Sequence, residues 1–337
     1  MNNNTPRPVA RGKVFAVAPM MDWTDRHCRV FHRHITRAAL LYTEMVTEQA
    51  VRHGDRAKLL GFDAVEHPVA LQLGGSHPGH LAEAARIGEE FGYDEINLNV
   101  GCPSDRVQGG HFGACLMAEP ALVARCFAAM QEAVAVPVTV KCRIGIDDQD
   151  EERALDAFVA SVAEAGCTRF IIHARKAWLK GLSPKENREV PPLNYDRVHR
   201  LKRANPGLTI SLNGGLVSVC AGLPHLDTLD GIMLGRVAYH NPWQLSEVDP
   251  CFGGGASPVA TRREAALAMM LYAERQCAKG APLHHITRHM LGLYHAQPGG
   301  RLWRQILTME GAKPDAGPGV ILKGLAAVEA QAARLAA

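Results

Sequence analysis

Eight short apolar segments recur along the chain at intervals of a few tens of residues, and this repetition constrains the fold more than any other feature. The segments are rich in β-branched residues, and alanine-rich stretches with helical periodicity separate most of them. The predicted strands are Val14–Ala18, Leu40–Thr43, Val69–Leu73, Glu95–Asn99, Val138–Arg143, Arg169–His173, Thr209–Leu212 and Gly231–Leu234. The clearest predicted helices between them are His80–Phe91, Pro120–Ala133, Glu151–Ala165 and Tyr195–Ala204.

This alternation predicts an α/β fold with a parallel sheet. Eight βα units close naturally into a (β/α)8 TIM barrel. An open doubly wound sheet that binds a dinucleotide would normally carry a Gly-x-Gly-x-x-Gly turn, and the sequence has none. We therefore predict a TIM-barrel catalytic domain over residues 1–245.

A small all-helical domain is predicted after the barrel. The glycine-rich stretch Gly253–Pro258 has the composition of a linker. Helical patterns follow at Thr261–Lys279, Leu283–Leu293 and Gly300–Thr308, so the second domain is assigned to residues 256–337.

Positive charge is concentrated in this second domain. The formal net charge of the chain is only +3, yet residues 261–337 hold ten Lys/Arg against five Asp/Glu. Such asymmetry suits a polyanionic partner, although a solvated basic helical face would have the same composition.

The remaining bulk properties are those of a cytoplasmic protein without a membrane segment. Hydrophobic residues make up 47% and charged residues 21% of the chain, and no run of apolar residues approaches a membrane span. The leader Met1–Pro8 lacks the apolar core of a secretory signal. The nine cysteines form no Cys-x-x-Cys pair or zinc-type spacing, so most are expected to be buried reduced thiols. His285 and His289 are four residues apart, but we expect surface histidines rather than a metal site.

The chemistry of a barrel enzyme lies where strands run into their following loops. The glycines after the seventh and eighth strands sit in the two loops that often bind phosphate in barrels. Amide, cationic and imidazole side chains at other strand ends suit the heteroatom edge of a flavin ring and the negative charge of its reduced form. The residues at these strand ends include Pro19, Met20, Gln72, Asn97, Asn99, Lys141, Arg143, His173, Arg175, Asn213, Gly214, Gly215, Gly235 and Arg236.

The glycine-rich segment Asn99–Met117 follows the fourth predicted strand directly and has the composition of an active-site loop. Cys102 lies near its start, where partial exposure would let the thiol act chemically. A thiol can donate a proton near neutral pH without help from a metal. Cys115 lies at the apolar end of the segment and is expected to be packed.

Several motifs together resemble the tRNA-dihydrouridine synthase family. They are Ala18–Met20, Asn97–Ser104, Lys141–Arg143, Ile172–Arg175 and Leu212–Gly215, and the resemblance covers about residues 14 to 243. Two longer segments, Gly101–Met117 and His173–Pro192, are similar to the bacterial A subfamily.

The resemblance implies FMN as cofactor, NADPH as reductant and uridines 20 and 20a of the tRNA D-loop as substrate. It implies hydride transfer from flavin N5 to uridine C6 and proton transfer from Cys102 to C5. Asn99 would contact the flipped-out uridine. The residues implied to hold FMN are Pro19, Met20, Gln72, Lys141, His173, Asn213, Gly214, Gly215, Gly235 and Arg236.

The resemblance also implies that the C-terminal helices dock tRNA. We expect a monomeric enzyme with no stable protein partner. Further RNA contacts are expected on the loop after the sixth strand, although single Lys and Arg residues are most often solvated surface charges. The expected tRNA contacts are Arg143, Arg175, Lys185, Glu186, Arg188, Glu189, Arg301 and Arg304, with Arg288 and Lys279 as further candidates.

Two other functions are compatible with such a fold. One is a flavin-dependent barrel oxidoreductase that acts on a small molecule, against which the basic helical tail argues. The other is a non-enzymatic RNA-binding scaffold, against which the chemistry of the strand ends argues.

Overall fold

The computed structural model describes residues 12–104, 109–253 and 255–336. The leader Met1–Pro8 and residues 105–108 of the predicted active-site loop lie outside the described residues. By their contacts the described residues form two compact units. One comprises residues 12–21 and 40–235, and the other comprises residues 22–39 and 236–336.

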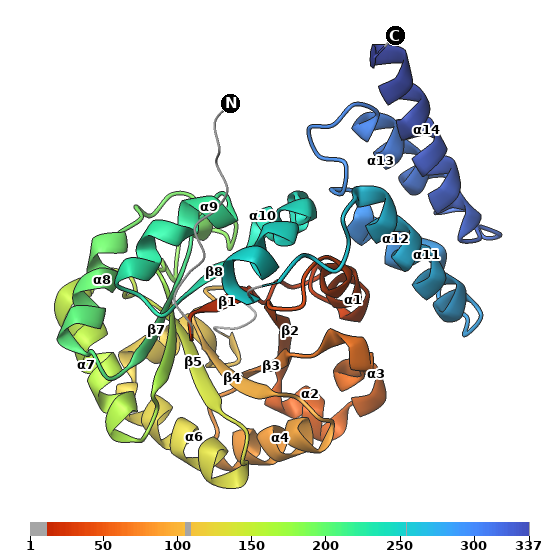
Figure 1. Ribbon diagram of the computed structural model, residues 1–337. Coiled ribbons are helices and arrows are strands. Elements are labelled where there is room, and N and C mark those ends of the chain that lie inside the picture. Colours follow the sequence, from red (N-terminus) through yellow and green to blue (C-terminus); the bar gives the residue numbers. More distant parts are fainter. Residues whose placement is uncertain (1–11, 105–108, 254, 337) are drawn as a thin grey trace. The chain divides into compact units, whose positions relative to one another are not determined.

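The first unit contains a closed barrel of eight parallel strands, in sequence order from β1 to β8 (Figure 1). This confirms the predicted TIM barrel. The eight predicted strands agree with the observed ones to within one residue at each end, except that β2 is four residues longer. The strands are β1 Val14–Val17, β2 Leu40–Thr47, β3 Val69–Gly74, β4 Glu95–Val100, β5 Val138–Arg143, β6 Arg169–His173, β7 Thr209–Asn213 and β8 Gly231–Leu234.

Helices lie around the outside of this barrel (Figure 1). They are α2 Glu48–His53, α3 Arg56–Leu60, α4 Pro78–Glu90, α6 Pro120–Ala133, α7 Glu151–Glu164, α8 Tyr195–Ala204 and α9 Val219–Gly222. Alternate strand residues such as Ile96, Leu98 and Val100 are fully buried between the barrel and this helical layer.

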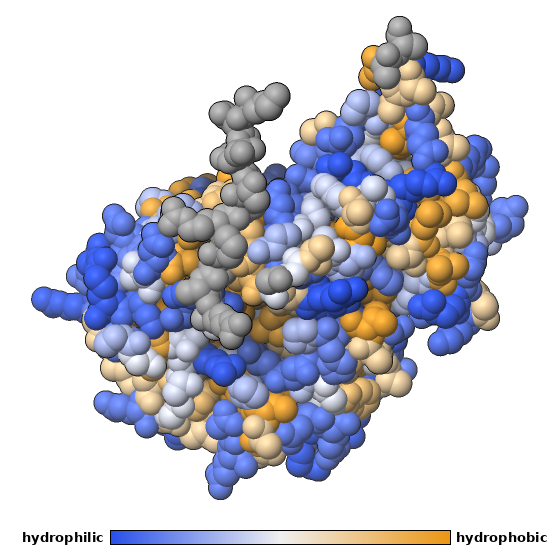
Figure 2. All heavy atoms as spheres, in the orientation of Figure 1, coloured by the Kyte–Doolittle hydropathy of each residue, from blue (hydrophilic) through white to orange (hydrophobic). Residues whose placement is uncertain are grey.

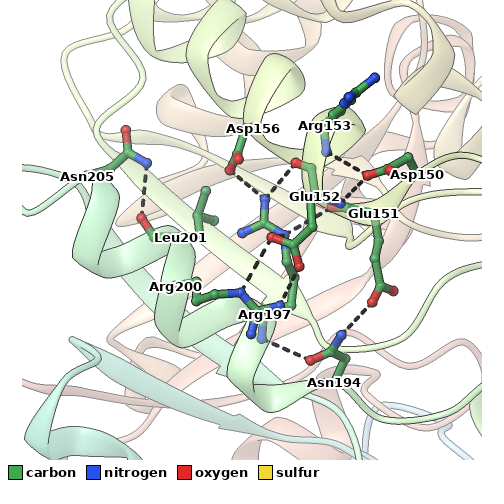
Figure 3. Close-up of polar contacts among 10 residues, drawn as sticks. All are labelled: Asp150, Glu151, Glu152, Arg153, Asp156, Asn194, Arg197, Arg200, Leu201 and Asn205. Carbon is green, nitrogen blue, oxygen red and sulfur yellow. Dashed lines mark hydrogen bonds and ion pairs between the residues drawn. The ribbon is translucent and has the colours of Figure 1, made fainter.

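A buried arginine fastens two of the outer helices together (Figure 3). Arg197 of α8 is 1% exposed, and its guanidinium donates to the carbonyl oxygens of Glu151 and Glu152 in the first turn of α7. It also pairs with the carboxylate of Asp156, one turn further along. Asn194 caps α8 by accepting from the backbone N–H of Arg197. The helices that follow β5 and β6 are thereby held in a fixed relation.

Apolar side chains fill part of the barrel interior, where Tyr42 packs with Ala16, Ala18, Ala70, Ile171 and Met233. Its hydroxyl donates to Oε1 of Glu95 over 2.5 Å, and the hydroxyl of Thr139 donates to the same oxygen over 2.7 Å. Burial raises the pKa of Glu95, against the lowering effect of these two hydrogen bonds. The carboxyl ends of the strands, here called the barrel mouth, are where barrels of this kind carry their functional residues.

The second unit is helical in its described part. It contains α1 Arg26–Ile35, α10 Arg236–His240, α11 Arg262–Cys277, α12 Leu283–Thr287, α13 Gly300–Met309 and α14 Gly319–Ala336. This confirms a helical region after the barrel, although α12 is shorter than predicted and is followed by a 3₁₀ turn at Arg288–Met290. The sequence analysis missed α14. Its buried residues Ile321, Leu325 and Val328 follow the helical spacing of four and three.

The surface of the C-terminal helices mixes hydrophilic and hydrophobic side chains (Figure 2). Leu271 of α11, Met309 of α13 and Leu335 of α14 are each more than half exposed. No described helix combines the length and the hydropathy that a membrane crossing requires.

Candidate active site

A directional chain of hydrogen bonds joins three carboxamides at the barrel mouth. Nδ2 of Asn99 donates to Oε1 of Gln72, Nε2 of Gln72 donates to Oδ1 of Asn97, and Nδ2 of Asn97 donates to the hydroxyl of Thr139, each over 2.8 Å. Thr139 in turn donates to Glu95. The four donor and acceptor roles are consistent with one another, so each amide has one possible orientation.

The upper end of this chain holds the segment that carries Cys102. Oδ1 of Asn99 accepts from the backbone N–H groups of Gly101 and Cys102, each over 3.0 Å. The carbonyl of Cys102 accepts from the N–H of Ala114, at the start of the 3₁₀ turn Gly113–Ala118. The thiol is half-buried, with Sγ 3.5 Å from Oγ of Ser104. A thiol so placed is anchored through its backbone and keeps access to solvent.

Three basic side chains meet at the ends of β5 and β6. Lys141 lies opposite Asn99 in the sheet register, and Arg143 lies opposite His173. Burial and the nearby Arg143 lower the pKa of Lys141 to about 8. Burial, together with Arg143 and Lys141, lowers the pKa of His173 well below its usual value, so its imidazole is neutral at pH 7. The mouth therefore presents cations beside a neutral imidazole.

The loop after β7 approaches this cluster closely. Gly214 and Gly215 have φ of +105° and +68°. A Cβ on Gly214 would lie 2.4 Å from Cδ2 of His173, and one on Gly215 would lie 2.3 Å from Cδ1 of Leu193. Only glycine satisfies both the backbone conformation and the space. Asn213 is fixed from the other side, because its Nδ2 donates to the carbonyl of Met233 over 2.8 Å.

The remaining predicted cofactor residues lie at the ends of β1 and β8. Pro19 and Met20 are half-buried directly after β1. Gly235 follows β8 in the barrel unit, and Arg236 begins α10 in the helical unit. The structure thus brings Gln72, Lys141, His173, Asn213, Gly214 and Gly215 into one mouth, together with Asn99 and Cys102.

Arg143, a predicted tRNA contact, is only 4% exposed, and its guanidinium donates hydrogen bonds to backbone carbonyl oxygens. It donates to Gly101, Lys176 and Asn187 over 3.1, 3.2 and 2.9 Å. These bonds tie the loop after β4 to the loop after β6. Arg175 also donates to carbonyls, those of Glu189 and Pro191, on the second of these loops.

The other predicted RNA contacts are exposed. Lys185, Glu186, Arg188 and Glu189 lie on the surface of the loop after β6, around the 3₁₀ turn Glu186–Arg188. Sequence reasoning missed Asn187 in their midst, a fully buried residue whose amide bonds to Trp178, Leu182 and Ser183 and orders the loop. In the helical unit Arg301, Arg304, Arg288 and Lys279 are exposed as well.

The expectation that His289 is a surface residue is wrong. It is 1% exposed, and its Nε2 lies 3.0 Å from the carboxylate of Asp25. Arg288 donates to Oδ2 of the same carboxylate over 2.6 Å. Asp25 also caps α1 by accepting from the N–H groups of His27 and Cys28. Its distance of 264 residues along the chain left no local signal for the pairing. His285 is exposed, as expected.

Comparison with known proteins gives consistent results. The model of the family described as "Dihydrouridine synthase (Dus)" matches residues 16–330. A "tRNA-dihydrouridine(20/20a) synthase" of Xanthomonas campestris pv. campestris is 55% identical over 332 residues, which cover 98% of each chain. A protein of the same name from Vibrio cholerae is 56% identical and covers 94% of this chain and 97% of its own.

A solved structure is similar in fold alone. A 2-naphthoyl-CoA reductase in complex with 2-naphthoyl-CoA superposes with a TM-score of 0.56 at 10% identity. The superposition covers 74% of this chain and 52% of the reductase.

Proposed function

This chain belongs to the dihydrouridine synthase family, and on that premise we propose that it reduces uridine to 5,6-dihydrouridine in tRNA, at positions 20 and 20a. The observation that carries the proposal is the identity of 55% with a tRNA-dihydrouridine(20/20a) synthase along 98% of both chains. Because the match includes the helical unit, it supports a tRNA substrate as well as the chemistry of the barrel.

FMN fits the residues at the barrel mouth. Gly214 packs directly against His173, because a Cβ there would lie 2.4 Å from Cδ2 of the imidazole, and the backbone N–H groups of such a glycine turn suit a phosphate group. After its bonds to Asn99 and Asn97, the amide of Gln72 still has one N–H and one lone pair for the ring edge. Lys141 supplies a cation where negative charge would develop. We propose that Pro19, Met20, Gln72, Lys141, His173, Asn213, Gly214, Gly215, Gly235 and Arg236 hold the cofactor.

When bound, FMN would supply the hydride that uridine C6 receives, at the expense of NADPH. The chain itself then has to bind the extruded base, orient it and deliver one proton to C5. Asn99 keeps one free N–H for the base after its bond to Gln72. Cys102 follows Asn99 by three residues and supplies the proton from its half-buried thiol. Lys141 and Arg143 lie within electrostatic reach of this thiol.

Arg143 acts in this scheme by positioning. It joins Gly101, next to Cys102, to the loop after β6 that carries Lys185, Glu186, Arg188 and Glu189. Contact of RNA with that exposed loop would therefore be transmitted to the segment of the proton donor.

The test is direct mapping of dihydrouridine by mass spectrometry. When purified, FMN-loaded enzyme acts on an unmodified tRNA transcript with NADPH, the uridines at positions 20 and 20a should each gain two mass units. In tRNA from cells that lack the gene, the same positions should remain uridine. An enzyme for small molecules would leave the transcript unmodified and would show no salt-dependent tRNA retention. Either result would overturn the proposal.

A further inference from the structure

A recess in the helical unit combines aromatic faces with basic side chains. Its volume is about 750 Å³, within the range of pockets that hold small organic ligands. Its lining includes the aromatic rings of Trp23, Tyr239 and His240 and the guanidinium groups of Arg288, Arg301 and Arg304. No carboxylate is among the described lining residues.

One wall of the recess is a stacked aromatic pair. The rings of Trp23 and Tyr239 lie parallel, with centroids 4.6 Å apart and an interplanar angle of 10°. His240 meets Trp23 edge-on at 5.0 Å. Both stacked rings are only half-buried. A flat aromatic ligand could extend such a stack at little entropic cost, because the rings are already aligned.

The stack is held in place from behind. Tyr239 meets His289 edge-on at 5.7 Å, and His289 is bound to Asp25. Asp25 also fixes Arg288, whose guanidinium lines the recess. The backbone at Gly292 packs directly against that of His240, since a Cβ on Gly292 would lie 2.5 Å from the carbonyl oxygen of His240. The recess is therefore a built feature of the unit and not a gap between loose side chains.

The other wall carries free positive charge. Arg301 and Arg304 lie three residues apart on α13 and so share one face of that helix. Both are exposed, and neither forms a hydrogen bond or ion pair within the part of the chain that the structure describes. Aromatic stacking beside unpaired arginines is the chemistry that recognises a nucleobase with its flanking phosphates.

We propose that this recess binds one nucleotide of the RNA substrate, apart from the uridine that is reduced. Its base stacks on the face of Trp23, and its flanking phosphates pair with Arg301 and Arg304. The inference rests on the proposed action on tRNA. The same chemistry would suit the adenosine phosphate of NADPH. We favour RNA because two separate arginines on one helix face match two successive phosphates of a strand.

The experiment measures binding of an unmodified tRNA transcript to the full-length enzyme at several salt concentrations. Trp23→Leu should weaken binding about 5- to 150-fold at every salt concentration, the loss expected for one stacked base, whereas Trp23→Phe should restore most of the affinity. Arg301→Gln and Arg304→Gln should each reduce the slope of log affinity against log salt by about 0.7 to 1. Arg334→Gln removes an equally exposed charge of α14 outside the recess and should leave the slope unchanged.

The arginine variants change exposed side chains, so they test the proposal even if Trp23→Leu folds poorly. Wild-type affinity in Trp23→Leu, or an unchanged salt slope in both arginine variants, would overturn the inference. So would a raised KM for NADPH with unchanged tRNA affinity, which would assign the recess to the dinucleotide. Mapping of dihydrouridine made by the wild-type enzyme separates the two claims. If the wild-type enzyme makes no dihydrouridine, the proposed function is refuted. The expected binding pattern would in that case still support an RNA-binding recess.

Discussion

The carboxamide oxygen of Asn99 accepts the backbone N–H of Cys102 over 3.0 Å, so the orientation of one side chain sets the position of the other. That orientation is fixed in turn through Gln72 and Asn97 down to Thr139 in the barrel interior. This buried hydrogen-bond chain thus sets the position of the loop that carries the proposed proton donor.

Thr139→Val tests this connection. The change keeps the shape of the side chain but leaves Nδ2 of Asn97 without its acceptor, which should lower the free energy of unfolding by about 1–3 kcal/mol. Asn99 should then be less well oriented, and the N–H groups of Gly101 and Cys102 should exchange faster with deuterium. The control is Thr209→Val, since that strand hydroxyl makes no hydrogen bond to any described residue. If the exchange rates at Gly101 and Cys102 are unchanged in Thr139→Val, the hydrogen-bond chain does not control the conformation of the loop.

Lys141 should make FMN binding dependent on pH. Its pKa is lowered to about 8 by burial and by Arg143, so the ammonium is present below pH 8 and is lost above it. The affinity for the anionic cofactor should therefore be highest near pH 7 and fall as the pH rises through about 8. Arg143 remains charged to higher pH, and His173 is neutral throughout.

Fluorescence titration with FMN between about pH 7 and 8.5 measures the effect of Lys141, because Arg143, whose pKa burial lowers to about 9, still carries most of its charge there. Lys141→Gln should bind FMN more weakly, with an affinity that no longer changes over this interval. Lys180→Gln, which removes an exposed charge in the same unit, should behave as the wild type. Equal affinity of Lys141→Gln and wild type at pH 7 would show that Lys141 has been misassigned.

The barrel could be predicted from the sequence because its signals are local. Apolar runs bounded by loops gave all eight strands, and the residues at their carboxyl ends necessarily meet at one mouth. Three features had no such signal. The amide chain depends on registers such as Gln72 against Asn97, which only the closed sheet defines. Asn187 looks like any loop residue. Asp25 and His289 are brought together solely by the packing of the helical unit.

Domain boundaries illustrate the same limit. A linear reading assigns residues 1–245 and 256–337 to two domains, and this stays a prediction. By contact, residues 22–39 associate with 236–336, because α1 packs on the later helices: His27 bonds to Tyr272 over 2.8 Å, and Ser257 donates to the carbonyl of Ile35. Sequence periodicity can find α1 or α11, but it contains no information on which of them lie together.

Asp25→Asn should destabilise the helical unit in a pH-dependent way. Burial alone would raise the pKa of this carboxyl, but His289, the Cys28 amide and Arg288 hold it well below its usual value near 4. A depressed pKa contributes stability that is present above about pH 4 and is lost as the pH falls below it. Asp25→Asn keeps an oxygen for the cap and loses the charge, so we expect a loss of about 2–4 kcal/mol at pH 7.

Urea unfolding of both proteins at pH 7 and at pH 3 measures this difference. The difference in the free energy of unfolding should be large at pH 7 and smaller at pH 3, where the wild-type protein begins to lose the stability that the Asp25 carboxylate contributes. Asp55→Asn changes another N-cap aspartate, one that is exposed on α3, and should cost less than about 1 kcal/mol. A difference for Asp25→Asn that is the same at both pH values would contradict a role for its charge.

Cys102→Ala separates proton transfer from all the other steps. The change removes the thiol but leaves the backbone N–H that Asn99 holds, so the loop should keep its conformation. The variant should bind FMN and tRNA as the wild type does, yet reduce uridine about 10² to 10⁴ times more slowly, the usual contribution of a positioned general acid. Rapid mixing of NADPH-reduced enzyme with unmodified tRNA measures this step as the return of flavin absorbance.

Cys115→Ala is the matched control. Its half-buried thiol donates to the carbonyl of Phe112, so its loss should affect stability more than rate. If flavin absorbance returns at the same rate in Cys102→Ala and in the wild type, the thiol is not the acid.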